Sequence, residues 1–564
     1  MRCASRSNRC LRLTVFHVAV LSFLGCRPGT PGSASSGSAT TESAKDDVGA
    51  DTLLDSAIEL LQSNKRTSTA HLIAAQRLNQ YLNSSRASGQ ALIDSISADV
   101  RRSLGARLSP RQLSLIENTQ FDRIDSGHLE RCFLLRDTAK LVTGGMRESN
   151  TKVEALFDWV VRNIQLTGPD NSVPIPLSPQ LALLIGRGNE MERAWLFMEM
   201  LRQLEIETVM LGYLDKDPES NLTIHVPWLP AVLIDDSLYL FDTTLGLPVP
   251  GSNGQGVATL QQVLDDPDLL AELQVDEKQT YRVGPEQLKK LIVLLESTPT
   301  YWAPRMRFLQ DRLSANSQAV LWSDLTDLSL RIRKATGDGI EQDLWLLPKT
   351  VEEVSHQKEY WEQLMGSREQ PLGLMTAYQF LTGIDARVAH MQGRWTDAIP
   401  LYMGNRIAFF EWLAVQRNQD GFKAIAFHAS APEAPQPDVV ATIASKMQEI
   451  YESLREDCTY FLSVAKFEQC EHEPAISWAS NYLAKYPNGK WTAGARFHLA
   501  RCAEAQKDVA KAIEYYTADR DSPQAIGNMI RARRLGWKPD TAENTSDVKT
   551  IPLSGQTDSS TSKP

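Results

Sequence analysis

The sequence predicts an α+β fold that is mainly α-helical, and three observations support this prediction. Apolar residues recur at helical spacing through most of residues 51–141 and again after residue 349. Short apolar runs typical of strands lie close together between residues 208 and 241. Similar pairs of helical segments recur towards the C-terminal end. We therefore expect a helical leader, a mixed domain and a series of helical hairpins.

The length and charge of the chain limit its organisation and its partners. With 564 residues, the chain should form about two to four packed units. Hydrophobic residues make up 42% and charged residues 23%, as in ordinary globular proteins. The formal net charge is -10, and no basic stripe is present that could neutralise a phosphate backbone. Nucleic acid is therefore not expected as a partner.

The first residues have the order of a targeting segment. An apolar run from Leu13 to Leu24 follows a positively charged start and ends at Gly25 and Cys26; the charged residues are Arg2, Arg6, Arg9 and Arg12. A bilayer-spanning helix needs about 20 apolar residues, so this run is too short to cross a membrane. Its length suits the core of a signal peptide.

The end of this segment resembles the lipobox of bacterial lipoproteins, in which a Cys after a small residue is lipidated. Gly25 and Cys26 match the pattern, although Phe23 stands where the family prefers Leu. The resemblance implies a signal peptide at residues 1–25, a lipid on Cys26 and an exported protein anchored in the bacterial cell envelope, facing the periplasm or exterior. An ordinary secretory signal or a retained membrane anchor is the alternative.

Composition and apolar spacing divide the rest of the chain. Residues 27–47 and the last residues are rich in Gly, Ser, Thr and Pro and poor in large apolar side chains, which is typical of flexible segments. The expected ranges are a disordered tether at 26–50, a helical leader at 51–149, a mixed α+β domain at 150–270, a mainly helical connecting region at 271–348, helical-hairpin repeats at 349–537 and a disordered tail at 538–564.

The mixed domain should have helices first and an antiparallel sheet after them. Helical spacing occurs from Val153 to Ile164, and a stronger helix is expected to begin at Asn189. The expected strands are residues 208–213, 228–234 and 238–241. Asp235-Asp236-Ser237 joins the last two strands and is typical of a hairpin turn.

The C-terminal region contains a recurring pattern of small and aromatic residues. Ala-Ile pairs begin at Ala398, Ala475 and Ala512, and an aromatic residue follows three or four positions after each of these Ala residues. A small residue precedes each pair at a constant interval; these residues are Ala386, Ser463 and Ala500. The pattern resembles tetratricopeptide repeats, whose period is about 34 residues and which bind protein partners. A plain helical bundle is the alternative.

The mixed domain resembles the transglutaminase-like fold, the papain-related family of Cys-His-Asp enzymes. Trp159–Ile164 matches the Trp-Val-x-x-Asn-Ile run that precedes the nucleophile. Gly188-Asn189-Glu190 and Leu201–Ile206 match the start and end of the helix that carries the nucleophile. Val226-Pro227-Trp228 and Leu240–Thr244 match the strands that carry the base His and the Asp.

The catalytic triad that this resemblance implies is incomplete. Glu190 stands at the nucleophile position and Val226 at the base position, whereas Asp242 matches. A carboxylate cannot replace a thiolate in thioester chemistry. Asn189 can instead act as the helix N-cap, with Glu192 at the capping-box position. The degenerate triad Glu190, Val226 and Asp242 therefore predicts a pseudoenzyme with no confident catalytic residue.

Three other arrangements of residues could restore a catalytic site. His225 is adjacent to the base position, but alternation along the strand turns it to the opposite face from Trp228 unless a bulge intervenes. Cys132 could enter the cleft, although its surroundings are typical of a packed helix. Glu190 and Asp242 could form an acid–base pair. We expect no cofactor and no metal site, since the Gly-rich stretch 251–256 lacks a following Lys-Ser or Lys-Thr and no His or Cys pair has ligand spacing.

These observations favour a lipid-anchored, non-catalytic scaffold or protein-interaction protein. In this hypothesis the helical repeats bind a protein partner and the lipid on Cys26 holds the chain at a membrane. One alternative is a transglutaminase-like hydrolase or peptidase with a rearranged active site. A second is a structural envelope protein whose domains act as spacers.

Overall fold

The computed structural model confirms an α+β fold that is mainly helical. It describes residues 42–62, 68–87, 93, 96–168, 176–275, 280–366, 383–406 and 437–538. Within these residues helices predominate, and six strands form one mixed sheet. Cys26, the expected signal peptide and nearly all of the expected tail lie outside the described residues.

The N-terminal part is helical, as expected. Helices α1, α2 and α5 share a core formed by side chains such as Leu78, Leu129 and Phe133, whereas α3 and α4 pack on the core of the sheet. Side-chain caps fix two helix starts: Ser109 and Asp122 accept hydrogen bonds from backbone N–H groups one turn ahead. The helices are α1 (Glu42–Gln62), α2 (Ser68–Ala87), α3 (Ala98–Gly105), α4 (Pro110–Glu117) and α5 (Arg123–Thr143).

Helix α1 begins inside the stretch that was expected to be a disordered tether. The tether was predicted to reach residue 50, but the helix starts at Glu42. The apolar half of α1 is held against the other leader helices by Leu54, Ile58 and Leu61. A helix extends at low cost once part of it is fixed, so the polar residues before Asp51 continue the same helix.

The next elements place the candidate site. Asn163 ends the first of these helices, and two short strands pair in parallel beside it through Gln165 and Arg187. The central helix α8 packs its apolar face against the sheet, where Trp195 contacts residues of two strands. The elements are α6 (Ser149–Asn163), β1 (Gln165–Leu166), α7 (Pro179–Ile185), β2 (Arg187–Gly188) and α8 (Glu190–Arg202).

The sheet has the strand order β6-β5-β4-β3-β7-β8. All neighbouring strands are antiparallel except β7 and β8, which are parallel. The predicted hairpin is confirmed: Ile234 pairs with Ser237, and Asp235 and Asp236 both have positive φ, as a two-residue turn requires. The strands are β3 (Thr208–Lys216), β4 (Thr223–Ile234), β5 (Ser237–Asp242), β6 (Leu247–Pro248), β7 (Leu291–Leu295) and β8 (Glu341–Leu344).

Two of these strands, β7 and β8, lie beyond residue 270, where the mixed domain was expected to end. The expected connecting region 271–348 therefore contributes to the sheet as well as containing helices. The helical elements around these strands are η1 (Ser252–Gly254), α9 (Leu260–Asp265), η2 (Pro267–Leu273), α10 (Pro285–Leu288), α11 (Pro299–Trp302), α12 (Pro304–Gln310), α13 (Leu325–Thr336), α14 (Leu346–Val354) and α15 (Lys358–Gly366).

Helical hairpins occur at the three places where small residues recur. In each hairpin both small residues are fully buried, and the Ser463 hydroxyl donates a hydrogen bond to the Ala475 carbonyl across one hairpin. The hairpins are α17 (Gly383–Met391) with α18 (Trp395–Gly404), α21 (Pro437–Glu468) with α22 (His472–Lys485), and α23 (Thr492–Ala505) with α24 (Val509–Thr517); α25 (Ala525–Arg534) follows them.

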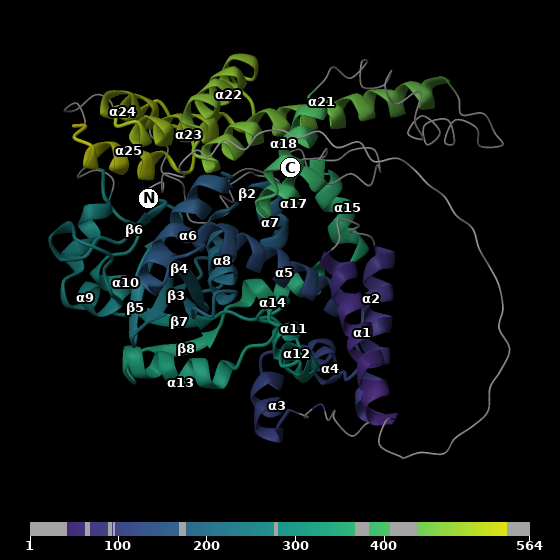
Figure 1. The fold of residues 1–564 in the computed structure, drawn as a ribbon. Helices are drawn as coiled ribbons and strands as arrows, with labels where there is room; N and C mark the ends of the chain where they lie inside the picture. Colours follow the sequence, from purple (N-terminus) through teal and green to yellow (C-terminus); the bar gives the residue numbers. More distant parts are fainter. Residues whose placement is uncertain are drawn as a thin grey trace, which may run out of the picture.

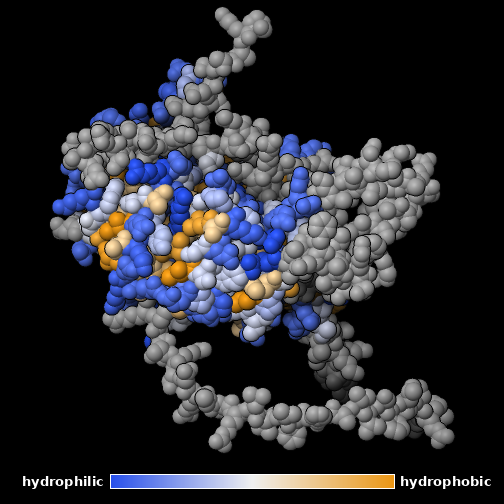
Figure 2. Space-filling model, turned by 90° about the horizontal axis from the view of Figure 1, so that it is seen from above, coloured by the Kyte–Doolittle hydropathy of each residue, from blue (hydrophilic) through white to orange (hydrophobic). Residues whose placement is uncertain are grey.

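The hairpins pack on the mixed domain, so the two parts share a core. One apolar cluster joins α6 and α8 with α23, α24 and α25. Polar contacts cross the same boundary: Asn163 donates to Glu468, and His498 contacts the Arg162 carbonyl. Figure 1 shows the hairpins as a layer above the sheet, with α22 and α24 on the side away from it. Seen from above in Figure 2, described apolar residues form separate patches between hydrophilic ones.

Gly527 on α25 lies so close to the loop after β5 that one added methyl group should destabilise the protein. A Cβ atom added to Gly527 on α25 would lie 1.8 Å from the backbone oxygen of Leu245. Gly527→Ala should therefore push α25 off the loop after β5 and lower the free energy of unfolding by about 3 kcal/mol. Thermal and urea unfolding of the full chain measure this loss.

A matched control separates this clash from a general effect of Gly-to-Ala substitution. Gly127 lies within α5, and a Cβ added there has no atom within 4 Å. Gly127→Ala should leave stability unchanged or raise it by up to about 1 kcal/mol, since Ala favours helices over Gly. Equal stability of the two variants would contradict the packing described here.

Candidate functional site

The start of α8 has the cap that the sequence predicts. The Asn189 side chain accepts hydrogen bonds from the backbone N–H groups of Met191 and Glu192. The Glu192 carboxylate in turn accepts one from the Asn189 N–H at 2.8 Å, which completes the capping box. Its other oxygen accepts from the Leu177 N–H at 2.6 Å. Asn189 and Glu192 thus fix the helix start and the segment before α7.

Within the residues that the structure describes, Glu192 forms no ion pair, and this affects its titration. Burial raises the pKa of its carboxyl to about 7, while the two backbone hydrogen bonds from Leu177 and Asn189 oppose the shift. Removal from water disfavours the charged form of a carboxyl group. Near neutral pH the group is therefore close to its titration midpoint.

Glu190 is the first residue of α8 and stands where the nucleophile was expected. Its Oε2 atom accepts a hydrogen bond from the Thr244 hydroxyl at 3.1 Å and from Arg282 Nη1 at 3.0 Å. About one fifth of the side chain is exposed. The position therefore holds a carboxylate in an ion pair, which has no nucleophilic sulfur or hydroxyl to offer.

Asp242 ends β5 and is fully buried. Its Oδ1 atom accepts hydrogen bonds from the backbone N–H groups of Thr244 and Leu245 at 2.9 and 2.8 Å. Its Oδ2 atom accepts one from the Tyr281 hydroxyl at 2.5 Å. Both oxygens are thus used to hold the loop after β5 and the segment around Tyr281.

Tyr281 and Arg282 were not singled out from the sequence, yet they join the two acids. The Arg282 guanidinium lies 3.0 Å from Glu190 Oε2 and 3.8 Å from Asp242 Oδ2, and it also donates to the Trp228 carbonyl. Burial and the neighbouring Asp242 raise the pKa of the Tyr281 hydroxyl well above its ordinary value. Only proximity in space identifies these two residues, because they carry no local motif.

The residue at the base position, Val226, is partly buried and apolar. Val226 packs against the apolar cluster on the sheet face that carries Trp228. A bulge does occur in β4: Leu229 pairs with Leu211, but Pro227 pairs with Gly212, so Trp228 is the extra residue. The strand before the bulge is regular, because His225, Val226 and Pro227 pair in continuous register with β3.

Because the bulge in β4 follows Pro227, it does not turn His225 towards Asp242. His225 pairs with Leu214, whose side chain packs against the cluster on the opposite face of the sheet. His225 Nδ1 lies 4.0 Å from Oδ2 of Asp343 on β8. The structure thus brings Glu190 and Asp242 together through Arg282, and it leaves both Val226 and His225 out of this group.

Cys132 lies in the interior of α5 and not in a cleft. Its sulfur is 3.7 Å from His128 Nε2 and 3.4 Å from the Tyr301 hydroxyl, and all three side chains are buried. Burial raises the pKa of the Cys132 thiol to about 11, so it is protonated at neutral pH. A protonated thiol enclosed by core residues is not a nucleophile.

The loop after Asp242 is covered by the C-terminal helices. Arg193 on α8 is fully buried and donates to the Gln524 side chain at 2.6 Å. Arg531 on α25 donates to the Gly246 carbonyl at 2.7 Å. Burial and the charge of Arg531 lower the pKa of the Arg193 guanidinium to about 9. Gln524 and α25 therefore close over one side of the candidate site.

Comparisons with protein-family models, with curated proteins and with solved structures found no match. Among the residues that the structure describes, no helix is long and apolar enough to cross a bilayer. No group of His, Cys, Asp and Glu in the same residues is arranged to hold a metal ion.

The ion pairs at Arg282 predict a structural role that can be measured. Arg282→Met should leave Glu190 and the buried Asp242 without their shared cation and lower the free energy of unfolding by about 3 kcal/mol. Chemical denaturation of the full chain measures the loss. Arg331→Met is the matched control, since Arg331 forms a more exposed ion pair with Glu207 and should cost less than about 1 kcal/mol. Equal losses in both variants would contradict this role.

Glu192 predicts a specific dependence of stability on pH. The folded pKa of about 7 is above the ordinary value of 4.5, so the folded state binds more protons between these pH values. The contribution of this group to stability is fully present below pH 4.5 and is lost as the pH rises to about 7. Glu192→Gln keeps a hydrogen-bond acceptor at the capping-box position but does not titrate.

Stability relative to wild type should therefore rise for Glu192→Gln between pH 4.5 and 7, by up to roughly 3 kcal/mol at about 1.4 kcal/mol per pKa unit. Urea unfolding of both proteins across this pH range gives the difference directly. A difference that stays constant with pH would show that the Glu192 carboxyl is not shifted by burial.

Proposed function

We propose that this protein is a lipid-anchored, non-catalytic scaffold of the bacterial cell envelope. It would be held at a membrane through a lipid on Cys26 and would bind a protein partner through its tetratricopeptide-like hairpins. Its mixed domain would be a degenerate transglutaminase-like domain. The proposal combines the sequence resemblances with the geometry around Glu190 and Asp242.

One observation carries the non-catalytic part of this proposal. At the place where a transglutaminase-like enzyme needs a nucleophile and a base, Arg282 joins Glu190 to Asp242, and the partly buried Val226 packs against the core. Nucleophilic catalysis needs a nucleophile within hydrogen-bond reach of a base. The Glu190–Arg282–Asp242 group holds no thiol and no imidazole, and hydrogen bonds and ion pairs engage both carboxylates. These contacts connect α8, β5 and the segment before α10.

The hairpins support the interaction part. Their first helices, α17, α21 and α23, contact the mixed domain, α21 through the hydrogen bond from Asn163 to Glu468. Helices α18, α22 and α24 form the second helix of each hairpin. On two of these outer helices a large apolar side chain reaches the surface: Met403 on α18 and Val509 on α24 are each a little more than two fifths exposed. Stacked hairpins provide extended surfaces for protein partners.

The experiment is capture of partners from detergent-solubilised membranes by the full chain. Val509→Arg and Met403→Arg place a charge on the outer helices and should lose at least one partner that wild type captures reproducibly. Leu330→Arg is the matched control, because Leu330 is exposed on α13, outside the hairpins. The control should keep every partner. Loss in the control as well, or in none of the variants, would contradict binding through the hairpins.

Two further arms test the rest of the proposal in the same preparation. Cys26→Ala should lose the lipid and release the mature chain from the membrane fraction, since lipid chains supply the membrane affinity. An unmodified mature terminus elsewhere in wild type would contradict the anchor.

Purified wild type should show no peptidase or transamidase turnover, before or after treatment with iodoacetamide. Turnover that disappears in Asp242→Ala would favour the alternative of a hydrolase with a rearranged active site.

A further inference from the structure

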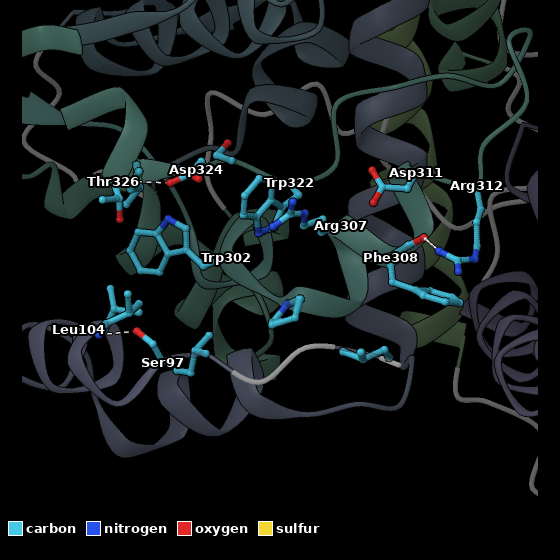
Figure 3. Close-up of a pocket in the computed structure, with 16 residues that line it drawn as sticks. Ser97, Leu104, Trp302, Arg307, Phe308, Asp311, Arg312, Trp322, Asp324 and Thr326 are labelled. Atoms are coloured by element: carbon cyan, nitrogen blue, oxygen red, sulfur yellow. Dashed lines mark hydrogen bonds between the residues drawn. The ribbon is translucent and has the colours of Figure 1, made fainter. Parts of the chain in front are cut away.

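A separate pocket of about 460 Å³ lies between α3, α12 and the segment that leads into α13 (Figure 3). None of its lining residues belongs to the group around Glu190 and Asp242. Its volume falls in the range of about 300–1,000 Å³ that is typical of sites for small molecules. Its lining is partly apolar, with aromatic and aliphatic side chains, and partly polar, with guanidinium, hydroxyl and carboxylate groups.

One buried polar group among the residues that line the pocket is a hydrogen-bond donor with no acceptor in the described part of the chain. Trp302 ends α11, and only 7% of it is exposed. Its indole Nε1 atom is buried and has no hydrogen-bond partner among the described residues. An indole N–H can only donate, and a buried donor left unpaired costs free energy. A ligand that offers an oxygen acceptor to Trp302 would remove this cost.

Two guanidinium groups in the pocket add to the donors. Arg307 lies over the Trp322 ring at 4.8 Å, and Arg312 lies over the Phe308 ring at 3.8 Å. Figure 3 shows Arg307 beside Trp322, and Arg312 beside Phe308. Within the described part of the chain, Arg307 forms no ion pair. A stacked guanidinium keeps its N–H edge available, and this edge matches the geometry of a carboxylate.

The two acidic residues that line the pocket lie at the surface, whereas the Trp302 N–H is buried. Asp311 and Asp324 are both exposed. Asp324 is already used as the N-cap of α13, where it accepts hydrogen bonds from the N–H groups of Thr326 and Asp327. The apolar part of the lining comes from Val100 and other aliphatic side chains, and Val100 is 39% exposed. An apolar body beside these side chains would remove apolar surface from water.

We propose that this pocket binds a small carboxylate with an apolar body. The carboxylate accepts hydrogen bonds from Trp302 Nε1 and from Arg307, and the apolar body lies against the aliphatic residues of α3. The site is independent of the proposed scaffold function and adds a small-molecule ligand to the protein.

Three probes of equal chain length test the proposal on the full chain: octanoate, octanol and octylamine. Titration followed by calorimetry and by Trp fluorescence should show saturable binding of octanoate. Octanol and octylamine should bind at least about tenfold more weakly, because a hydrogen bond to a charged group is worth about 1.5–3 kcal/mol, which is tenfold or more in affinity. No octanoate binding, or equal binding of octylamine, would overturn the proposal.

Two variants locate the binding in this pocket. Arg307→Gln removes the charge of an exposed side chain, and Trp302→Phe removes the buried N–H but keeps a ring. Each should weaken octanoate by about tenfold, while the affinity for octanol should change much less in Arg307→Gln. Trp361→Phe is the matched control, since Trp361 is exposed on α15 outside the pocket, and it should bind octanoate like wild type.

Circular dichroism and thermal unfolding show whether each variant is folded. Arg307 is exposed, so Arg307→Gln should melt like wild type, and its result decides the question even if Trp302→Phe is unstable. Unchanged octanoate affinity in a folded Arg307→Gln protein would overturn the assignment of the carboxylate to this pocket.

Discussion

The buried carboxylate of Asp242 is the interaction on which the arrangement of the molecule depends. Burying a charge is costly unless hydrogen bonds and an opposite charge offset the loss of water. Asp242 has both: two backbone N–H groups and the Tyr281 hydroxyl donate to it, and Arg282 lies 3.8 Å away. These contacts fix the loop after β5, and that loop is where the N-terminus of α8, the segment before α10 and the C-terminal α25 meet. The fold thus uses one charge to position three parts that are distant in sequence.

The hydrogen bonds to Asp242 also explain why α25 can pack so closely on the loop after β5. Gly527 meets the backbone of Leu245 with no room for a side chain, and Arg531 donates to the Gly246 carbonyl. A loop that changed conformation could not keep these contacts, because each needs a fixed carbonyl position. The hydrogen bonds from Thr244 and Leu245 to Asp242 supply that rigidity. In a Ser-His-Asp triad the carboxylate orients a His; Asp242 instead orients the backbone of the loop after β5.

The sequence predicted local features well and long-range ones poorly. The N-cap Asn189 and the turn at Asp235 and Asp236 depend on neighbouring residues, so their residue types indicate them directly. The strand Leu291–Leu295 is a continuous apolar run, buried on both faces, which spacing alone does not distinguish from a helix. In the candidate site Glu190 and Asp242 were found by resemblance, whereas Tyr281 and Arg282 were missed. Their role arises from contacts across 39 and 92 residues of sequence, which no local pattern records.

The packing of the hairpins on the mixed domain limits how a partner could bind them. In a free array of stacked hairpins both the inner and outer helices are available. Here α21 and α23 contact the mixed domain through Glu468 and His498, so those faces are already buried. The outer helices expose mainly polar and small residues, with Val509 and Met403 as isolated apolar groups. A partner bound there would gain little from apolar burial and more from hydrogen bonds and charge, so its affinity would depend on salt. The proposed scaffold would then suit reversible association better than a permanent complex.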